Sequence, residues 1–288
     1  MATPNGHRPK RAAAVALANQ KGGVGKTTTA VNAGVILARA GYRILLIDLD
    51  PQGNATSSLG LAKEDLLYTT YDVLVDDVSL PRAIAVTDRR NLDLVAATAS
   101  LAGAEVDLVG MANRERRLAT ALGTARERYD LILIDCPPSL GLLTVNALTA
   151  ADRVVIPIQC EFLALEGVSQ LVTTIGLVQQ GLNPDLEILG VLLTMFDGRT
   201  RLAGQVADEV RRHFTDRVFG SVIPRSIRLA EAPSYGQSIS EYDPASRGAV
   251  AYHQFVEELA DRLRLGEPSS VPTAPPPATV SVPSGQEA

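Results

Sequence analysis

Short, uniformly apolar runs recur along the chain, and longer stretches of mixed polarity separate them. The first run begins at Ala13 and shows no helical spacing, which is typical of a strand buried on both faces of a sheet. Similar runs follow it. The pattern predicts strands over residues 13–18, 43–48, 92–96, 131–135, 153–158, 186–193 and 218–223.

Helix-like stretches lie between these runs. We expect helices over residues 26–40, 103–128, 164–180, 202–214 and 246–264. Gly41 and Gly181 end the first and the third. Strands that alternate with helices favour a parallel sheet covered on both faces. The sequence therefore predicts an α/β fold with a single doubly wound, mainly parallel sheet and helices on both faces.

The composition along the chain predicts one folded domain with a short segment on each side. No internal repeat or linker divides residues 12–266, which we expect to form that domain. Residues 1–11 are polar and carry Arg8, Lys10 and Arg11, and they are expected to be a flexible basic segment. Residues 267–288 hold six of the 17 prolines and no aromatic residue, a composition typical of a disordered tail.

Overall composition excludes several classes of protein. The chain has 288 residues, 46% of them hydrophobic and 20% charged, and can bury a core of ordinary size. No apolar run approaches the roughly 18 residues of a membrane-spanning helix, and no signal peptide is visible, so a cytosolic protein without membrane binding is expected. Cys136 and Cys160 are too few for a disulfide framework. A net charge of -5 means that any nucleic-acid binding needs a local patch.

The strongest motif is ANQKGGVGKTTTA at residues 18–30. It lies between a predicted strand and a predicted helix, the context that a phosphate-binding loop requires. The backbone N–H groups of Gly22, Gly23 and Gly25 can converge on phosphate oxygens. Lys26 can reach the β and γ phosphates of a nucleoside triphosphate, and the Thr27 hydroxyl can ligate Mg²⁺.

This loop departs from the strict pattern G-x-x-x-x-G-K-[ST]. Gln20 stands where that pattern has its first glycine, and Lys21 adds a second cation. A glycine-rich turn that binds nothing is the alternative, but the number of matched positions and the strand-to-helix context disfavour it. Nucleotide contacts are predicted for Lys21, Gly22, Gly23, Val24, Gly25, Lys26, Thr27 and Thr28.

Acidic residues follow two other predicted strands. Asp48 and Asp50 lie in LLIDLDPQGN at residues 45–54, and Asp135 lies in YDLILIDCPPSLG at residues 129–141. Ligands of open α/β sheets bind at the carboxyl ends of the strands, so we expect Asp135 to hold Mg²⁺ through water. A solvated strand end is the alternative for Asp48 and Asp50. Cys136 is interpreted as a small buried residue rather than a metal ligand.

The segment KGGVGKTT at residues 21–28 resembles the deviant Walker A motif of the ParA/MinD class of P-loop ATPases. Two more segments, IPIQCEFLALEG at residues 156–167 and VIPRSIRLAEAPSYGQSI at residues 222–239, are similar to segments of ParA/Soj partition ATPases within that class. The resemblance implies the P-loop NTPase fold, ATP and Mg²⁺ as cofactors, and an ATP-sandwich homodimer in which Lys21 reaches the nucleotide of the other subunit.

The resemblance also implies roles for single residues. The catalytic residues would be Asp50, which orients the attacking water, together with Lys21 and Lys26. The residues near Mg²⁺ would be Thr27, Asp48 and Asp135. The adenine would lie beside the stretch that contains Pro224, Arg225 and Pro233.

A local basic surface is the expected route to nucleic acid. Between Asp197 and Glu231 there are seven arginines and five acidic residues. Arg211 and Arg212 lie on a predicted amphipathic helix and are interpreted as a solvated face. Arg199, Arg225 and Arg228 lie on predicted loops in segments that match the family, so contacts with the phosphates of double-stranded DNA are predicted for these three.

The family resemblance implies how DNA binding is controlled. ATP-dependent dimers bind DNA without sequence preference, and hydrolysis releases them. Intrinsic hydrolysis is expected to be weak, and a ParB-type centromere-binding protein is expected to stimulate it. The protein is then expected on the nucleoid.

Three relatives of a different kind are less favoured. A MinD-like positioning ATPase ends in a membrane-binding amphipathic helix, whereas this chain ends in a proline-rich segment. An iron-protein-like electron carrier takes two cysteines from each subunit, but Cys136 is displaced from the cluster position and Cys160 lacks a ligand context. Bacterial tyrosine kinases end in a tyrosine-rich tail, and residues 267–288 contain no tyrosine.

Overall fold

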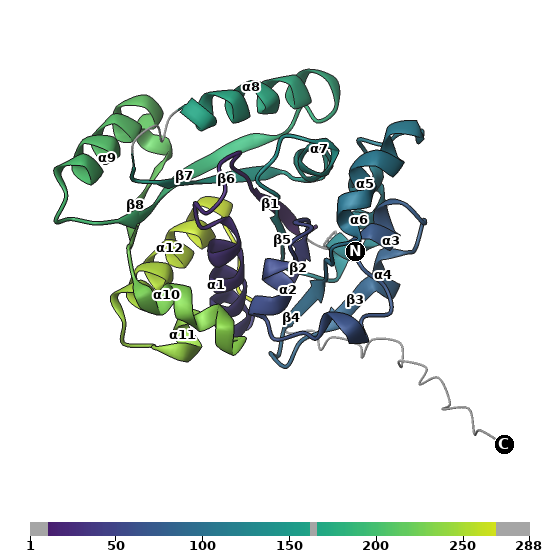
Figure 1. Ribbon diagram of the computed structural model, residues 1–288, viewed down its shortest axis with the longest axis horizontal. Coiled ribbons are helices and arrows are strands. Elements are labelled where there is room, and N and C mark those ends of the chain that lie inside the picture. The colour runs from purple at the N-terminus through teal and green to yellow at the C-terminus, as the bar shows by residue number, and fades with distance from the viewer. Residues whose placement is uncertain (1–10, 162–165, 269–288) are drawn as a thin grey trace, which may run out of the picture.

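The computed structural model describes residues 11–161 and 166–268 of the chain. The expected N-terminal segment, apart from Arg11, lies outside the described residues, and so does the expected tail, apart from Glu267 and Pro268. The first two residues of the helix expected over 164–180 also lie outside them. The described residues build one sheet with helices on both sides (Figure 1).

The sheet has eight strands in the order β3-β4-β2-β5-β1-β6-β7-β8. All neighbouring strands are parallel except β3 and β4, which are antiparallel. The strands are β1 (Ala13–Leu17), β2 (Ile44–Asp48), β3 (Ile84–Val86), β4 (Leu92–Val95), β5 (Leu131–Asp135), β6 (Arg153–Gln159), β7 (Glu187–Phe196) and β8 (Val218–Pro224). The predicted, mainly parallel α/β sheet is confirmed.

The helices vary from one turn to nearly five turns. They are α1 (Lys26–Arg39), α2 (Asn54–Ser58), α3 (Thr70–Leu74), α4 (Leu80–Ala83), α5 (Leu101–Asp107), α6 (Arg117–Leu122), α7 (Leu142–Ala150), α8 (Glu166–Gly181), α9 (Arg201–Phe214), α10 (Ile227–Glu231), α11 (Ile239–Tyr242) and α12 (Arg247–Leu263). Short 3-10 turns are η1 (Lys63–Asp65), η2 (Leu108–Gly110), η3 (Gly123–Glu127), η4 (Thr215–Arg217) and η5 (Ala232–Tyr235). Within the described ranges, none of these helices is long and apolar enough to cross a membrane.

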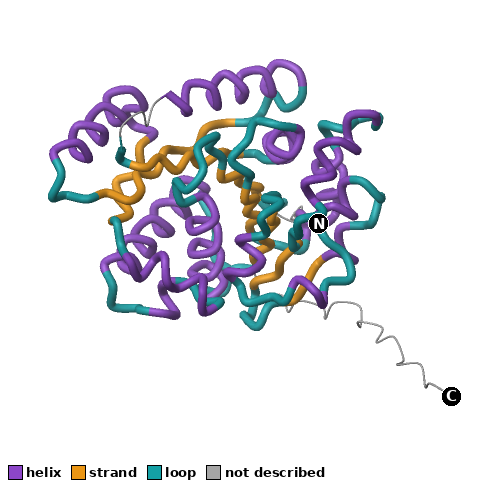
Figure 2. Tube along the Cα trace, in the orientation of Figure 1, coloured by secondary structure: helices purple, strands orange, loops and turns teal. Residues whose placement is uncertain are grey.

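Helices cover both faces of the sheet, as Figures 1 and 2 show. One face packs against α1 and α12, and the other packs against α5, α7, α8 and α9. Successive residues of β5 alternate between the two layers, because Ile132 and Ile134 belong to one apolar cluster and Leu131 and Leu133 to the other. Uniformly apolar strands are therefore needed at the centre of this sheet.

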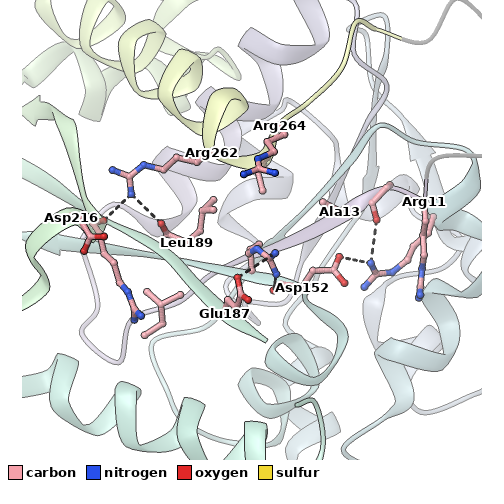
Figure 3. Close-up of a pocket in the computed structure, with 14 residues that line it drawn as sticks. Arg11, Ala13, Asp152, Glu187, Leu189, Asp216, Arg262 and Arg264 are labelled. Atoms are coloured by element: carbon pink, nitrogen blue, oxygen red, sulfur yellow. Dashed lines mark hydrogen bonds and ion pairs between the residues drawn. The ribbon is translucent and has the colours of Figure 1, made fainter. Parts of the chain in front are cut away.

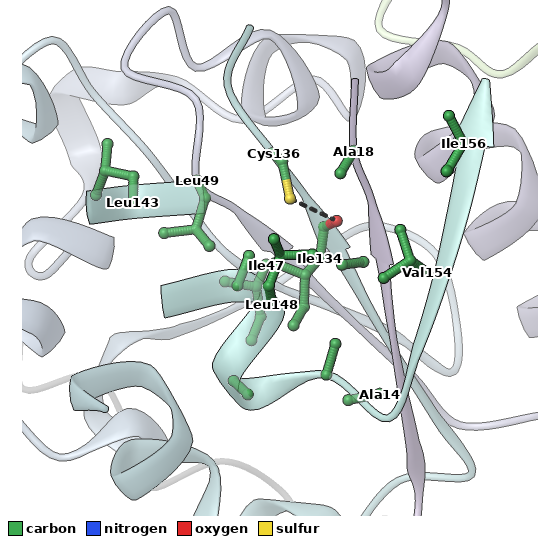
Figure 4. Close-up of a cluster of buried hydrophobic side chains, with 14 of the residues drawn as sticks. Ala14, Ala18, Ile47, Leu49, Ile134, Cys136, Leu143, Leu148, Val154 and Ile156 are labelled. Atoms are coloured by element: carbon green, nitrogen blue, oxygen red, sulfur yellow. Dashed lines mark hydrogen bonds between the residues drawn. The ribbon is translucent and has the colours of Figure 1, made fainter. Parts of the chain in front are cut away.

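Cys136 lies in the apolar cluster between the sheet and α7 (Figure 4). It is fully buried near Ile134 and Leu148, and burial raises the pKa of its thiol. The interpretation of Cys136 as a small buried residue is confirmed.

The single helix expected over residues 103–128 is wrong. The structure has α5, η2, an irregular loop, α6 and η3 there. Asn113 has a φ of 53°, a left-handed conformation that interrupts a right-handed helix. The buried side chain of Asn146 donates to the Arg114 carbonyl and accepts from the Leu118 N–H. These bonds replace backbone partners that a continuous helix would have supplied. The short helices and β3 were also not expected.

Candidate functional site

The glycine-rich motif forms the loop between β1 and α1. Gly23 and Gly25 have φ of 72° and 88°, a left-handed conformation that glycine adopts without steric cost. Gly25 directly precedes Lys26, the first residue of α1. The loop therefore turns the chain so that the N-terminus of α1 faces the region beyond the sheet edge. Free N–H groups and the helix dipole favour an anion at such a terminus.

Side chains from other elements hold this loop in place. The Thr194 hydroxyl, on β7, donates to the Val24 carbonyl at 2.9 Å. The Lys26 ammonium donates to the Lys21 carbonyl at 3.2 Å. Asn19 donates to a carbonyl of β6 at 2.7 Å and accepts from the Lys21 N–H at 3.0 Å. The backbone of the loop is thus fixed before any ligand binds.

Two carboxylates meet at the carboxyl edge of the sheet. The register of β2 and β5 places Asp48 opposite Asp135. Asp48 is fully buried, and its carboxylate accepts from the Thr56 N–H at 2.9 Å, the Thr56 hydroxyl at 2.8 Å and the Asp50 N–H at 3.1 Å. Burial outweighs these bonds and raises the pKa of Asp48 to about 6. Asp48 thereby anchors the loop that carries Asp50.

Asp135 has a different environment. It is fully buried at the end of β5, and neither carboxylate oxygen has a hydrogen-bond partner among the described residues. Burial raises the pKa of Asp135 well above its usual range, and the neighbouring Asp48 raises it further, while Thr27 and Lys26 act in the opposite direction. Burial also lowers the pKa of Lys26, against the attraction of Asp135. An unsatisfied buried carboxylate is costly unless a ligand completes it.

Asp50 lies two residues beyond the end of β2 and borders a cavity. Its side chain is largely buried, and Oδ1 accepts from the Gln52 N–H at 3.0 Å. The second oxygen, Oδ2, makes no hydrogen bond to any described residue. This oxygen can accept a hydrogen bond from water in the cavity.

The cavity over the loop has a volume of about 610 Å³. Its walls come from the loop itself, from the segment after β2, and from the ends of β7 and β8. The predicted nucleotide-contacting residues that line it are Gly22, Gly23, Gly25, Lys26, Thr27, Thr28, Pro224, Arg225 and Pro233. Lys21 is exposed beside it and Val24 is buried beneath it. The structure thus brings together segments that lie about 200 residues apart.

Sequence reasoning missed three residues of this site. Thr194 holds the loop, Thr56 holds Asp48, and Tyr252 borders the cavity with its hydroxyl 3.2 Å from that of Thr29. Thr194 lies on β7 and Tyr252 on α12, and neither element contains a recognisable sequence motif. Only the position of Thr56 just after the Asp50 segment could have pointed to it.

The donor set fits ATP together with Mg²⁺. No group of three or more His, Cys, Asp or Glu side chains in residues 11–161 and 166–268 could hold a metal ion by itself. A Mg²⁺ ion would instead depend on phosphate oxygens, the Thr27 hydroxyl and water held by the unsatisfied Asp135. Mg²⁺ usually binds in this way, since it keeps several waters and uses few protein groups.

The three arginines predicted to contact DNA lie outside or at the edge of the cavity. Arg199, with 88% of its side chain exposed, pairs with Asp197 at 2.7 Å. Arg225 (63%) pairs with Glu161 at 3.5 Å. Arg228 (57%) lies 3.1 Å from Glu231 and 3.7 Å from Asp243. All three are exposed near the carboxyl ends of β7 and β8, and each has an acidic partner.

Comparison with known proteins assigns the family. A family model described as an AAA domain matches residues 12–188. The sporulation initiation inhibitor protein Soj of Bacillus subtilis is 58% identical over 246 residues, which cover 85% of this chain and 97% of Soj. The chain belongs to the ParA/Soj family of chromosome-partitioning ATPases. The chromosome partitioning protein ParA of Myxococcus xanthus is 53% identical over 248 residues, covering 86% of this chain and 88% of that protein.

Solved structures confirm the P-loop NTPase fold of this partition ATPase. A Mycobacterium smegmatis structure described as cobyrinic acid a,c-diamide synthase with bound ADP and magnesium has a TM-score of 0.78 and 41% identity, and covers 91% of this chain and 100% of its own. A putative plasmid partition protein of Borrelia burgdorferi bound to AMPPNP has a TM-score of 0.75 and 26% identity, and covers 88% and 100%.

Proposed function

We propose that this protein is a DNA-partition ATPase that binds ATP with Mg²⁺, dimerises on it, binds DNA without sequence preference and leaves the DNA after hydrolysis. The observation that carries the proposal is the fixed phosphate-binding loop beside the unsatisfied, buried Asp135. The partition relatives support this function over that of the synthase-named structure, since Soj is 58% identical and that structure 41%.

Nucleotide binding uses charges and donors that the fold already positions. We assign Lys26 and the N–H groups at the start of α1 to the phosphates, and Pro224, Arg225 and Pro233 to the adenine, because all of them line the same cavity. Thr27, Asp48 and Asp135 are the residues assigned to the metal region. Bound Mg²⁺ neutralises charge on the β and γ phosphates.

Hydrolysis needs an oriented water and compensation for developing negative charge. Asp50 is assigned to the water, because its Oδ2 makes no hydrogen bond to a described residue and its loop is anchored through Asp48. Lys26 supplies one cation within the subunit. Lys21 is exposed beside the cavity and is assigned to the nucleotide of the second subunit. Weak intrinsic turnover follows, because the full set of charges requires a dimer.

DNA binding is assigned to Arg199, Arg225 and Arg228. Their acidic partners are no obstacle, since exposed ion pairs contribute only about 0–1 kcal/mol and exchange readily for phosphate. A dimer doubles the phosphate contacts, which makes DNA affinity depend on ATP. We assign a ParB-type centromere-binding protein as the activator of hydrolysis, and a cytoplasmic, nucleoid-associated location.

Light scattering after gel filtration tests this cycle. The wild-type chain, of 30.5 kDa, and its Asp50→Ala variant should both bind ATP, and the variant should accumulate at about twice the monomer mass because it cannot hydrolyse the nucleotide. With ADP both should elute as monomers. An Asp50→Ala protein that remains monomeric with ATP contradicts the assignment of Asp50.

A further inference from the structure

A second pocket, of about 840 Å³, lies at the opposite edge of the sheet, where β1, β6, β7 and β8 begin (Figure 3). Its lining is rich in charge. The six arginines are Arg11, Arg126, Arg153, Arg217, Arg262 and Arg264, and the three acidic residues are Asp152, Glu187 and Asp216. The pocket therefore has a formal charge of +3 in a chain whose net charge is -5.

Three of these arginines form the walls. Arg126 is buried, donates to main-chain carbonyls and pairs with Asp152. Arg153 lies 3.3 Å from Glu187. Arg262 donates to three main-chain carbonyls around β7 and β8 at 2.8 to 3.0 Å, two of which belong to residues of the pocket (Figure 3). Carbonyl oxygens fix this guanidinium without cancelling its charge, so a positive wall persists.

Two other arginines are exposed at the pocket. The side chains of Arg11 and Arg217 form no hydrogen bond or ion pair with any described residue. They differ in this from Arg199, Arg225 and Arg228, each of which has an acidic partner. A phosphate that approaches Arg11 or Arg217 therefore displaces no ion pair with another described residue.

We propose that this amino-edge pocket is a contact site for the phosphate backbone of DNA, with Arg11 and Arg217 as the phosphate ligands. Guanidinium groups bind phosphate through paired, charge-assisted hydrogen bonds. The lining carries six arginines from separate parts of the chain, residues 11, 126, 153, 217, 262 and 264. A polyanion such as DNA can contact several of these cations at once, whereas a single small anion contacts one or two.

The inference rests on the proposed DNA-binding function and adds a location to it. The nucleotide cavity opens at the carboxyl edge, and strands of five to ten residues separate the two edges by roughly 15–30 Å at about 3.3 Å per residue. A dimer formed over the nucleotides leaves the amino edges of both subunits facing outward. DNA can therefore reach this pocket in the ATP-bound state.

The test compares two charge-matched double variants in the full chain with ATP. Arg11→Ala/Arg217→Ala removes two contacts per subunit and therefore four per dimer. It should reduce DNA affinity at least tenfold, and should make the slope of log affinity against log salt shallower by about three to four units, at about 0.9 per lost contact. Arg90→Ala/Arg116→Ala removes two exposed arginines away from the pocket and should leave the slope unchanged. ATP-dependent dimerisation should survive in both variants.

The experiment distinguishes failure of the proposed function from failure of the pocket assignment. If the wild-type protein shows no ATP-dependent DNA binding, the proposed function fails. If the wild-type protein binds DNA and the Arg11→Ala/Arg217→Ala variant keeps its slope, the inference alone is overturned. A second experiment measures the binding of inorganic tripolyphosphate by calorimetry. If Arg11→Ala/Arg217→Ala loses tripolyphosphate binding but keeps the DNA affinity of the wild-type protein, the pocket is a small-anion site and its assignment to DNA is overturned.

Discussion

At the scale of single residues, Asp135 is where stability and function conflict most clearly. Its carboxylate is buried and has no hydrogen-bond partner in the part of the chain that the structure describes, which weakens the nucleotide-free fold. Such groups are concentrated at functional sites. Asp48, directly opposite, avoids this cost by accepting three hydrogen bonds. The difference suggests that Asp48 shapes the site, whereas Asp135 is completed by the ligand.

Asp135→Asn should stabilise the nucleotide-free protein. Because the folded state raises the pKa of Asp135, the wild-type fold loses stability as pH rises above about 4, the unfolded value. The gain in the free energy of unfolding should therefore be small at pH 5 and grow to on the order of 1–3 kcal/mol at pH 8. Urea denaturation at several pH values measures it. An equal gain at every pH, or no gain, contradicts the account.

Asp135→Asn should also be stabilised less by bound ATP and Mg²⁺ than the wild-type protein. ATP with Mg²⁺ should raise the midpoint of thermal unfolding of the wild-type protein by several degrees, and should raise that of Asp135→Asn much less. A full ATP-dependent shift in the variant would show that Asp135 does not support the metal.

Lys26→Ala should abolish ATP binding, because Lys26 is the buried cation assigned to the β and γ phosphates. Lys21→Ala is the matched control. It removes the exposed lysine assigned to the other subunit, so it should bind ATP but fail to dimerise or hydrolyse it. Titration with a fluorescent ATP analogue separates the two variants. Unchanged affinity in Lys26→Ala refutes the assignment of the phosphate-binding loop.

At the scale of elements, the site depends on contacts between parts of the chain that are distant in sequence. The hydroxyl of Thr194 on β7 holds the carbonyl of Val24, 170 positions earlier. Tyr252 on α12 meets Thr29 on α1, 223 positions apart. The order of the strands, rather than any local motif, brings these groups together.

Thr194→Val should loosen the phosphate-binding loop. It keeps the shape of the side chain but leaves the Val24 carbonyl without its partner, which should cost about 1–3 kcal/mol of stability and lower ATP affinity. Thr149→Val is the control, because the buried Thr149 hydroxyl has no hydrogen-bond partner among residues 11–161 and 166–268 and its loss should be neutral or stabilising. Urea denaturation and ATP titration of both variants provide the comparison. Equal behaviour of the two would contradict a role for Thr194.

The loop after β7 and the segment after β8 hold the three arginines predicted to contact DNA. Replacing Arg199, Arg225 or Arg228 singly with Ala should remove one phosphate contact per subunit and make the salt slope of the dimer shallower by about two units. Affinity should fall equally on unrelated duplexes, since phosphates carry no base information. Unaltered slopes in all three variants would place the basic surface elsewhere.

Local chemistry explains which parts could be predicted from the sequence. Asp48 and Asp135 end buried strands, and the glycine-rich loop and Asp50 come shortly after buried strands, so the pattern and the motif pointed to them together. The helix expected over 103–128 failed because its interruption depends on Asn146, which contacts that segment only in the folded chain. Thr194 and Tyr252 escaped prediction for the same reason.

At the scale of the whole molecule, the two edges of one sheet hold the two candidate binding sites. The carboxyl edge holds the nucleotide cavity and the surface assigned to dimerisation, and the amino edge holds a pocket of charge +3. With a net charge of -5, a monomer is expected to have low affinity for DNA, and under the proposed function the pairing of subunits would control binding. In the proposed cycle, hydrolysis is the event that releases DNA.

Retention of an arbitrary DNA duplex by the purified protein, measured with ATP, with ADP and without nucleotide, tests this account most directly. The account predicts retention with ATP alone, at low salt, and its loss in Lys26→Ala. Equal retention in all three conditions, or no retention with ATP, would contradict an ATP-controlled DNA-partition protein.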